Sequence, residues 1–250
     1  MKHILAVFTL LFTAQAFAEP MQGRLEWARR VDLATTVDGI VREVAARPGR
    51  FVAEGDVLVR LDAGEYEARV LAAQARVARA QPVFEEAQRE WARAEELYER
   101  TVLSDYELQQ ARIAFAAARA DRDEALAQRM EAEVHLARTR IVAPFDAMVL
   151  AVSAVPGQAV VNRLRPHPLV TVADGRRMAV HLTVPAARIG DLSVGAKVPV
   201  TVKEQTYAGT ITEIGLEPSS PGDYPVTAAF RFGKTLLRAG GSAWVDLDAE

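Results

Sequence analysis

The chain has 250 residues, of which 50% are hydrophobic and 25% are charged, with a formal net charge of -3. This is an ordinary globular composition, so it excludes a disordered or a collagen-like chain. The mild negative charge gives no basic face of the kind that nucleic-acid binding requires. Cysteine is absent, which excludes disulfides, thiolate metal sites and catalytic thiols.

Residues 1–18 have the pattern of a secretory signal peptide. Lys2 supplies the positive start, Ile4 to Phe12 form a short apolar run, and Ala16-Phe17-Ala18 form an A-x-A cleavage site. An uncleaved membrane anchor is the alternative, but the run is only about half of the roughly 20 residues that a membrane span needs. We therefore expect an exported mature chain that starts near Glu19.

Two distant segments resemble each other. "DGIVREVAARPGRFV" (38–52) and "DAMVLAVSAVPGQAV" (146–160) align without a gap and share a valine pair, Val41 and Val149, and a Pro-Gly turn. Each segment alternates apolar and polar residues around that turn, as strands and hairpins do. Each half is too short to bury a core alone. We predict that residues 34–62 and 139–173 close one lipoyl-like β-sandwich.

Residues 63–138, between these halves, read as two long helices. Apolar residues recur at heptad positions, which is the requirement for knobs-into-holes packing. Ser104 lies three residues before Glu107, a capping box that starts the second helix. A short connection between long helices predicts an antiparallel hairpin, roughly 50 Å long at about 1.5 Å per residue. Pro82 is discordant, because a proline inside a helix should kink it.

The remaining residues, 174–250, contain several short strand patterns separated by Gly, Pro and Asp, which predicts a small β-barrel. We expect residues 19–33 to contribute a further strand to this barrel. The predicted fold class is therefore mainly β with a long α-helical hairpin. A split lipoyl-like sandwich is interrupted by an antiparallel coiled coil and followed by a barrel, in an elongated molecule.

The sequence gives little support to a carrier domain or an enzyme. A lipoyl carrier needs a lysine at the turn between its halves, but no lysine lies between Glu19 and Lys197. The histidines of the mature chain, His135, His167 and His181, are not at metal-ligand spacing from one another. Phosphate-binding loops and nucleophile elbows are absent from the sequence. We expect no catalytic residues, no metal and no cofactor.

This order of segments resembles the periplasmic adaptor, or membrane-fusion, proteins of tripartite efflux pumps of the RND type, in the HlyD-like family. The residues that match the half-motifs of that family are Gly39, Gly49, Val52, Gly55, Asp56, Leu58, Leu61 and Asp62, and then Thr139, Ile141, Ala143, Pro144, Phe145, Asp146 and Gly157. The resemblance implies a membrane-proximal domain after the barrel, which we expect to be missing or reduced in this chain.

The resemblance also implies a contact site at the hairpin tip. Adaptors of this type share an Arg-x3-Leu-x6-Ser pattern that contacts a TolC-type outer-membrane channel, and Arg93, Leu97 and Ser104 have that spacing here. An exposed leucine flanked by a charge and a hydroxyl suits a small contact between helix ends. In the alternative interpretation Ser104 only caps a helix, Leu97 extends the seam, and Arg93 pairs with Glu90 or Glu96.

The function implied by the resemblance is that of a periplasmic adaptor between an inner-membrane RND transporter and a TolC-type channel. It implies self-association into a ring, a hexamer by resemblance, and peripheral association with the pump. Two alternatives stay open. One is an adaptor for an ABC-type exporter or for type I secretion, and the other is a periplasmic scaffold with no role in transport.

Overall fold

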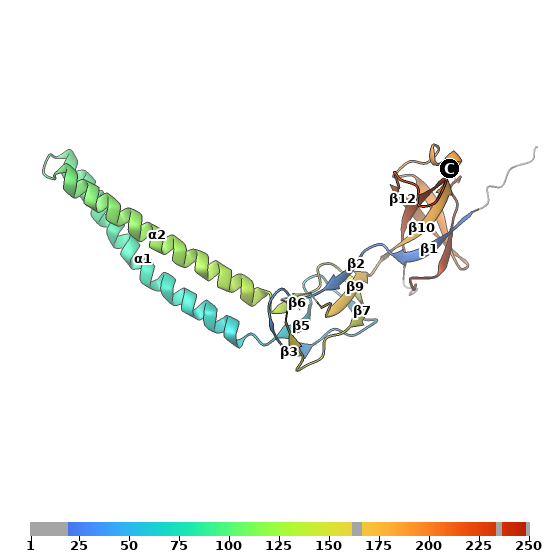
Figure 1. Cartoon of the computed structure of the whole chain (residues 1–250), viewed down its shortest axis with the longest axis horizontal. Coiled ribbons are helices and arrows are strands. Elements are labelled where there is room, and N and C mark those ends of the chain that lie inside the picture. Colours follow the sequence, from blue (N-terminus) through green and yellow to red (C-terminus); the bar gives the residue numbers. More distant parts are fainter. Residues whose placement is uncertain (1–19, 162–166, 234–236, 249–250) are drawn as a thin grey trace, which may run out of the picture. The chain divides into compact units, whose positions relative to one another are not determined.

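The computed structural model describes residues 20–161, 167–233 and 237–248, and it divides into two compact units. One unit runs from Arg30 to Gly175 and contains a β domain with a helical hairpin. The other joins the N-terminal segment up to Arg29 to residues from Arg176 onward. Figure 1 labels the elements for which there is room. The signal-peptide prediction for residues 1–18 lies outside the described residues.

The β domain of the first unit consists of two four-stranded sheets, in the orders β2-β9-β7-β4 and β6-β5-β3-β8. Each sheet contains strands from before the hairpin and strands from after it. Neither half of the sequence repeat therefore forms a sheet on its own. The strands are β2 (Arg30–Leu33), β3 (Gly39–Val44), β4 (Phe51–Val52), β5 (Val57–Leu61), β6 (Arg140–Val142), β7 (Ala147–Val152), β8 (Ala159–Val160) and β9 (Val170–Asp174).

The internal repeat appears in the structure as a pair of equivalent hydrogen bonds. The Gly49 N–H donates to the Val149 carbonyl at 2.8 Å, and the Gly157 N–H donates to the Val41 carbonyl at 2.8 Å. Both glycines have positive φ, +80° and +87°, which glycine adopts without steric cost. Val41 and Val149 are 1% and 0% exposed and belong to one core. The predicted sandwich of two sequence-distant halves is therefore confirmed.

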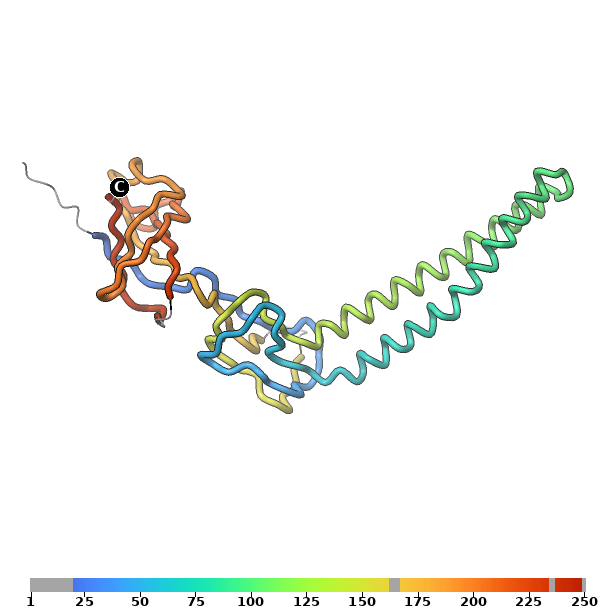
Figure 2. The backbone as a smooth tube through the Cα atoms, turned by 180° about the vertical axis from the view of Figure 1, so that it is seen from behind, coloured from blue at the N-terminus to red at the C-terminus, as the bar shows by residue number. Residues whose placement is uncertain are grey.

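Helices α1 (Gly64–Glu99) and α2 (Asp105–Ala137) form the predicted antiparallel hairpin and lie side by side in both views (Figures 1 and 2). The small side chains of the seam, which let the helices approach closely, are among the most buried residues: Ala73, Ala94, Ala118 and Ala125. Pro82 lies inside α1, and the chain is helical both before and after this proline.

Aromatic contacts reinforce the outer half of the hairpin. Trp91 stacks on Phe115 with ring centroids 4.6 Å apart, and Phe84 lies 5.6 Å from Phe115. The guanidinium carbon of Arg122 lies 3.8 Å from the centroid of the Phe84 ring. This cation–π contact explains how an arginine occupies a seam position that normally requires an apolar residue.

The base of the hairpin is fixed to the β domain by buried groups. Tyr66, in the first turn of α1, is 9% exposed, belongs to the core of the β domain and donates to the Asp38 carbonyl at 2.7 Å. Leu136, in the last turn of α2, packs against the same core. The Thr35 hydroxyl donates to the Arg138 carbonyl, just beyond the end of α2, at 3.2 Å. Both helices are thus anchored in the β domain.

The second unit contains a closed barrel with the strand order β1-β10-β13-β12-β11-β14. Its interior is an apolar core that includes Leu25, Met178, Val184, Val200 and Ile211. The elements are β1 (Met21–Trp27), β10 (Arg177–Pro185), the short helix α3 (Ala186–Ile189), β11 (Lys197–Val202), β12 (Gln205–Ile214), β13 (Asp223–Arg231) and β14 (Ser242–Val245).

One predicted boundary is wrong. Residues 19–33 were expected to belong to the barrel as a whole, but only Met21–Trp27 pairs there, with β10 and β14. Arg30–Leu33 pairs with β9 in the other unit. The physical reason is that the apolar side chains of Val31 and Leu33 pack against the core of the β domain. Among the described residues, no helix has the length and hydropathy to cross a membrane.

Replacing Trp91 with alanine tests the aromatic contact in the hairpin. The side chain is half-buried and stacked on Phe115, so we expect the free energy of unfolding to fall by about 2 kcal/mol, less than for a fully buried tryptophan. Ile113→Ala, at an α2 side chain that is 51% exposed, is the control and should be nearly neutral. Equal shifts of the two variants in a thermal melt would contradict this prediction.

Candidate functional site

The tip of the hairpin is a tightly bonded turn. The Thr101 N–H donates to the Tyr98 carbonyl at 2.8 Å, and the Val102 N–H donates to the Leu97 carbonyl at 3.0 Å. These two bonds form a Schellman motif, which satisfies carbonyls that the end of a helix leaves without partners. The connection between the helices is therefore ordered by the end of α1 itself.

Thr101 occupies a backbone conformation that is unusual for its residue type. Its φ is 60°, in the left-handed region, where the Schellman motif normally places glycine. A β-branched residue is an outlier there, because its Cβ lies too close to the backbone, at a cost of roughly 1–2 kcal/mol. The tip thus contains a strained residue that the surrounding hydrogen bonds hold in place.

Ser104 starts α2 through the predicted capping box. The Glu107 N–H donates to Ser104 Oγ at 3.3 Å, and the Ser104 N–H donates to Glu107 Oε2 at 3.0 Å. The Ser104 hydroxyl also donates to Glu107 Oε2 at 2.7 Å. These bonds from the backbone and the side chain of Ser104 lower the pKa of Glu107 below its ordinary value.

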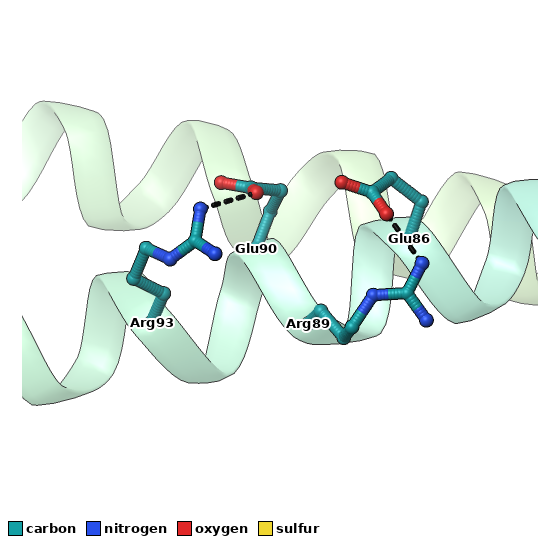
Figure 3. A network of polar contacts seen from close by, with 4 residues as sticks. All are labelled: Glu86, Arg89, Glu90 and Arg93. Carbon is teal, nitrogen blue, oxygen red and sulfur yellow. Dashed lines mark hydrogen bonds and ion pairs between the residues drawn. The ribbon is translucent and has the colours of Figure 1, made fainter.

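Arg93 lies on the outer surface of α1 and forms an ion pair with Glu90 at 2.7 Å, next to a pair between Glu86 and Arg89 (Figure 3). Its side chain is 65% exposed. Such exposed pairs contribute little to stability, because water and salt screen them. The guanidinium of Arg93 is therefore accessible from solvent and free to exchange Glu90 for another acceptor.

Leu97 is half-buried, which agrees with the interpretation in which it extends the seam and not with the one in which it is exposed. The next residue, Tyr98, is 41% exposed. A straight helix drifts relative to a strict seven-residue repeat, so the inward face shifts by one residue along a long seam. The three predicted site residues thus have separate local roles. Arg93 forms an ion pair, the Leu97 carbonyl accepts a bond at the end of α1, and Ser104 caps the start of α2.

The sequence interpretation missed the most exposed apolar residues of the tip. Val102 is 70% exposed and Tyr106 is 72% exposed, and together with Tyr98 they are spaced four residues apart across the turn. A hydrogen bond to Asp105 raises the pKa of Tyr98 above its ordinary value, which links the last turn of α1 to the first turn of α2. The four-residue spacing of Tyr98, Val102 and Tyr106 is visible in the sequence. The exposure of these side chains, however, depends on how the turn folds.

The described part of the chain offers little for metal chemistry. It contains no group of three or more His, Asp or Glu side chains placed to hold a metal ion. Open grooves run along the hairpin instead, and one of about 710 Å³ is lined by Trp91 and Phe115 together with Arg112 and Arg119. Such surfaces suit contacts with another macromolecule better than catalysis.

Comparison with known families decides the classification. Residues 29–174, which contain both β halves and the hairpin, match the family model described as the CzcB-like, barrel-sandwich hybrid domain. The chain belongs to this family. The β domain is accordingly called the hybrid domain from here on. The proteins that it resembles are adaptors of efflux systems rather than enzymes.

Individual relatives support the same assignment. The chain is 30% identical over 129 residues to the multidrug resistance protein MdtA of Klebsiella pneumoniae, an alignment that covers 51% of this chain and 31% of the relative. The chain thus spans about a third of the length of that curated relative.

Solved structures show the same fold. The membrane fusion protein Spr0693 of Streptococcus pneumoniae R6 has a TM-score of 0.68 at 21% identity, covering 93% of this chain and 100% of that one. A MacA–MexA chimera that contains the α-hairpin of Pseudomonas aeruginosa MexA has a TM-score of 0.65 at 23% identity, covering 91% of this chain and 80% of that one.

Thr101→Gly tests the strain at the tip. Glycine adopts positive φ without a steric penalty, so the variant should raise the free energy of unfolding of the hairpin by about 1 kcal/mol, after the greater freedom of glycine in the unfolded chain is subtracted. The measurement is a thermal or urea unfolding curve followed by helical circular dichroism. A lower melting temperature would show that Thr101 is not strained.

Ser104→Ala tests the capping box, and its expected cost is about 1 kcal/mol. Because the pKa of Glu107 is lowered in the folded state, its ionised carboxylate stabilises the fold above the pKa of the unfolded chain. This contribution is lost as the pH falls through the lowered pKa of the folded state. The difference in the free energy of unfolding between the two proteins should narrow as the pH falls from 7 to 3, because the bond from the Ser104 hydroxyl to the ionised Glu107 carboxylate is lost, and a constant difference would refute the linkage.

Proposed function

We propose that this chain is a non-catalytic periplasmic adaptor that joins an inner-membrane RND efflux transporter to a TolC-type outer-membrane channel. The observation that carries the proposal is a hairpin of two long helices whose base is buried in a hybrid domain of the CzcB-like family. A hairpin anchored at one end presents its tip to a partner at a distance. Export by a signal peptide places the adaptor in the periplasm.

The relatives favour the RND class of transporter. In sequence, the chain aligns with the multidrug resistance protein MdtA, which supports a role in the efflux of small molecules. An adaptor for an ABC-type exporter is the second candidate, since a hybrid domain with a hairpin fits either class of transporter. In either system, the energy for transport comes from the transporter.

The proposed assembly assigns a role to each part. The barrel contacts the transporter, hybrid domains of several copies pack side by side in a ring, and the hairpin tips contact the channel. Arg93, Leu97 and Ser104 contribute to the channel contact. The exposed guanidinium of Arg93 offers hydrogen bonds to acceptors on a facing helix end, while Leu97 and Ser104 fix the shape of the turn.

Recovery of partners from cells tests this function. The full chain with a C-terminal tag is expressed at its native level, crosslinked in intact cells with a short amine-reactive or carboxyl-reactive reagent, and purified after the membranes are solubilised. We expect mass spectrometry to find one inner-membrane transporter of the RND class and one outer-membrane channel. Arg93→Glu should reduce recovery of the channel severalfold without changing recovery of the transporter.

The alternatives give different results in the same experiment. Recovery of an ABC-type exporter in place of an RND transporter would establish the second candidate. Recovery of neither a transporter nor a channel, from a chain that is present in the periplasm and folded, would refute an adaptor role. Arg112→Glu, on α2 and outside the tip, is the control for a general effect of charge reversal on the hairpin.

A further inference from the structure

The tip carries an apolar surface that neither the fold nor the capping of the helices requires. Tyr98 lies in the last turn of α1, Val102 in the connection, and Tyr106 in the first turn of α2, and they are 41%, 70% and 72% exposed. We call these three residues the tip patch. Burial of such side chains against a partner lowers the free energy, and rigid aromatic residues are typical anchors of binding surfaces.

Hydrogen bonds hold the tip patch in a fixed arrangement. The Val102 N–H bonds to the Leu97 carbonyl, the Tyr98 hydroxyl interacts with the Asp105 carboxylate, and the capping box of Ser104 fixes the start of α2. Thr101 holds its strained conformation immediately before Val102. Strained backbone of this kind concentrates at binding sites, and a surface ordered in advance loses less entropy on binding.

Negative charge surrounds the tip patch. Between residues 95 and 107 the chain has five carboxylates and one guanidinium, that of Arg100, so the formal charge of this segment is -4. Arg100 is already paired with Glu96 at 2.6 Å. Along the shaft of α1, by contrast, arginines and carboxylates alternate and pair, as Glu86 with Arg89 and Glu90 with Arg93 (Figure 3). The carboxylates of Glu95 and Glu99 remain available to a positive partner, while those of Asp105 and Glu107 keep their negative charge but are bonded within the tip.

We propose that the tip patch is the docking surface of the hairpin, and that its partner is a protein with an apolar depression bordered by lysine or arginine residues. The proposal rests on the proposed function, in which that partner is the outer-membrane channel. Charge selects this occupant over others. The tip of a second copy would bring two negative segments together, and an anionic lipid surface would repel the same carboxylates.

Site-specific photocrosslinking tests this docking surface. p-Benzoylphenylalanine replaces Val102 in the full chain, which is expressed in the organism that encodes it and irradiated in intact cells. We expect an adduct with an outer-membrane protein, with the crosslinked segment flanked by lysine or arginine. The same probe at Ile113, whose side chain is 51% exposed on the shaft of α2, is the matched control and should give no such adduct.

Charge reversal tests the second half of the proposal. Glu99→Lys places a cation at the C-terminus of α1, where the helix dipole tolerates it, so the hairpin should remain folded. The yield of the adduct from position 102 should fall by about fivefold or more, and raising the salt concentration should lower the yield of the unsubstituted protein in the same direction. Asp121→Lys, on the shaft of α2, should leave the yield unchanged.

The outcomes separate this inference from the function on which it rests. If position 93 gives adducts with the channel but positions 102 and 106 do not, the tip patch is not the docking surface, while the adaptor function stands. If no position at the tip gives an adduct with any channel, both proposals fail. Adducts with lipid or with a second copy at position 102 would overturn the choice of partner, and an unchanged yield for Glu99→Lys would overturn the role of charge.

Discussion

The meeting of two distant β halves is the constraint on which the rest of this structure depends. The bonds from Gly49 to Val149 and from Gly157 to Val41 join segments separated by the whole hairpin. A flexible connection of that length would oppose closure through its entropy. Antiparallel packing of α1 against α2 brings the two ends of the insert together, so the halves meet as if a short loop joined them.

The same arrangement determines how the hairpin is supported. Tyr66 and Leu136 lie in the terminal turns nearest the hybrid domain and share its core, so the packing that closes the domain also holds both helices at their base. Farther out, the seam consists largely of alanines, which bury little area each. Stability there depends on the stacked rings of Trp91 and Phe115 and on Arg122 over Phe84.

The surface of the hairpin changes in character from shaft to tip. Paired charges along α1 leave the shaft close to neutral and well solvated, while the tip combines exposed apolar side chains with carboxylates in excess. The strained Thr101 and the capping box of Ser104 give this end a fixed shape. The two ends of the hairpin thus differ in kind: the base is buried in the hybrid domain, and the tip presents apolar and acidic side chains to solvent.

The sequence by itself determined the repeat, the heptad seam, the capping box and the strand patterns of the barrel, because each is a periodic or local signal that the backbone must obey. Tertiary structure alone decided the exchange of strands between the halves, the pairing of Arg30–Leu33 with β9, and the inward turn of Leu97 with exposure of Tyr98. These depend on which surfaces are available after the chain has folded. The local sequence pattern does not contain that information, because the burial of a side chain depends on which other residues pack against it.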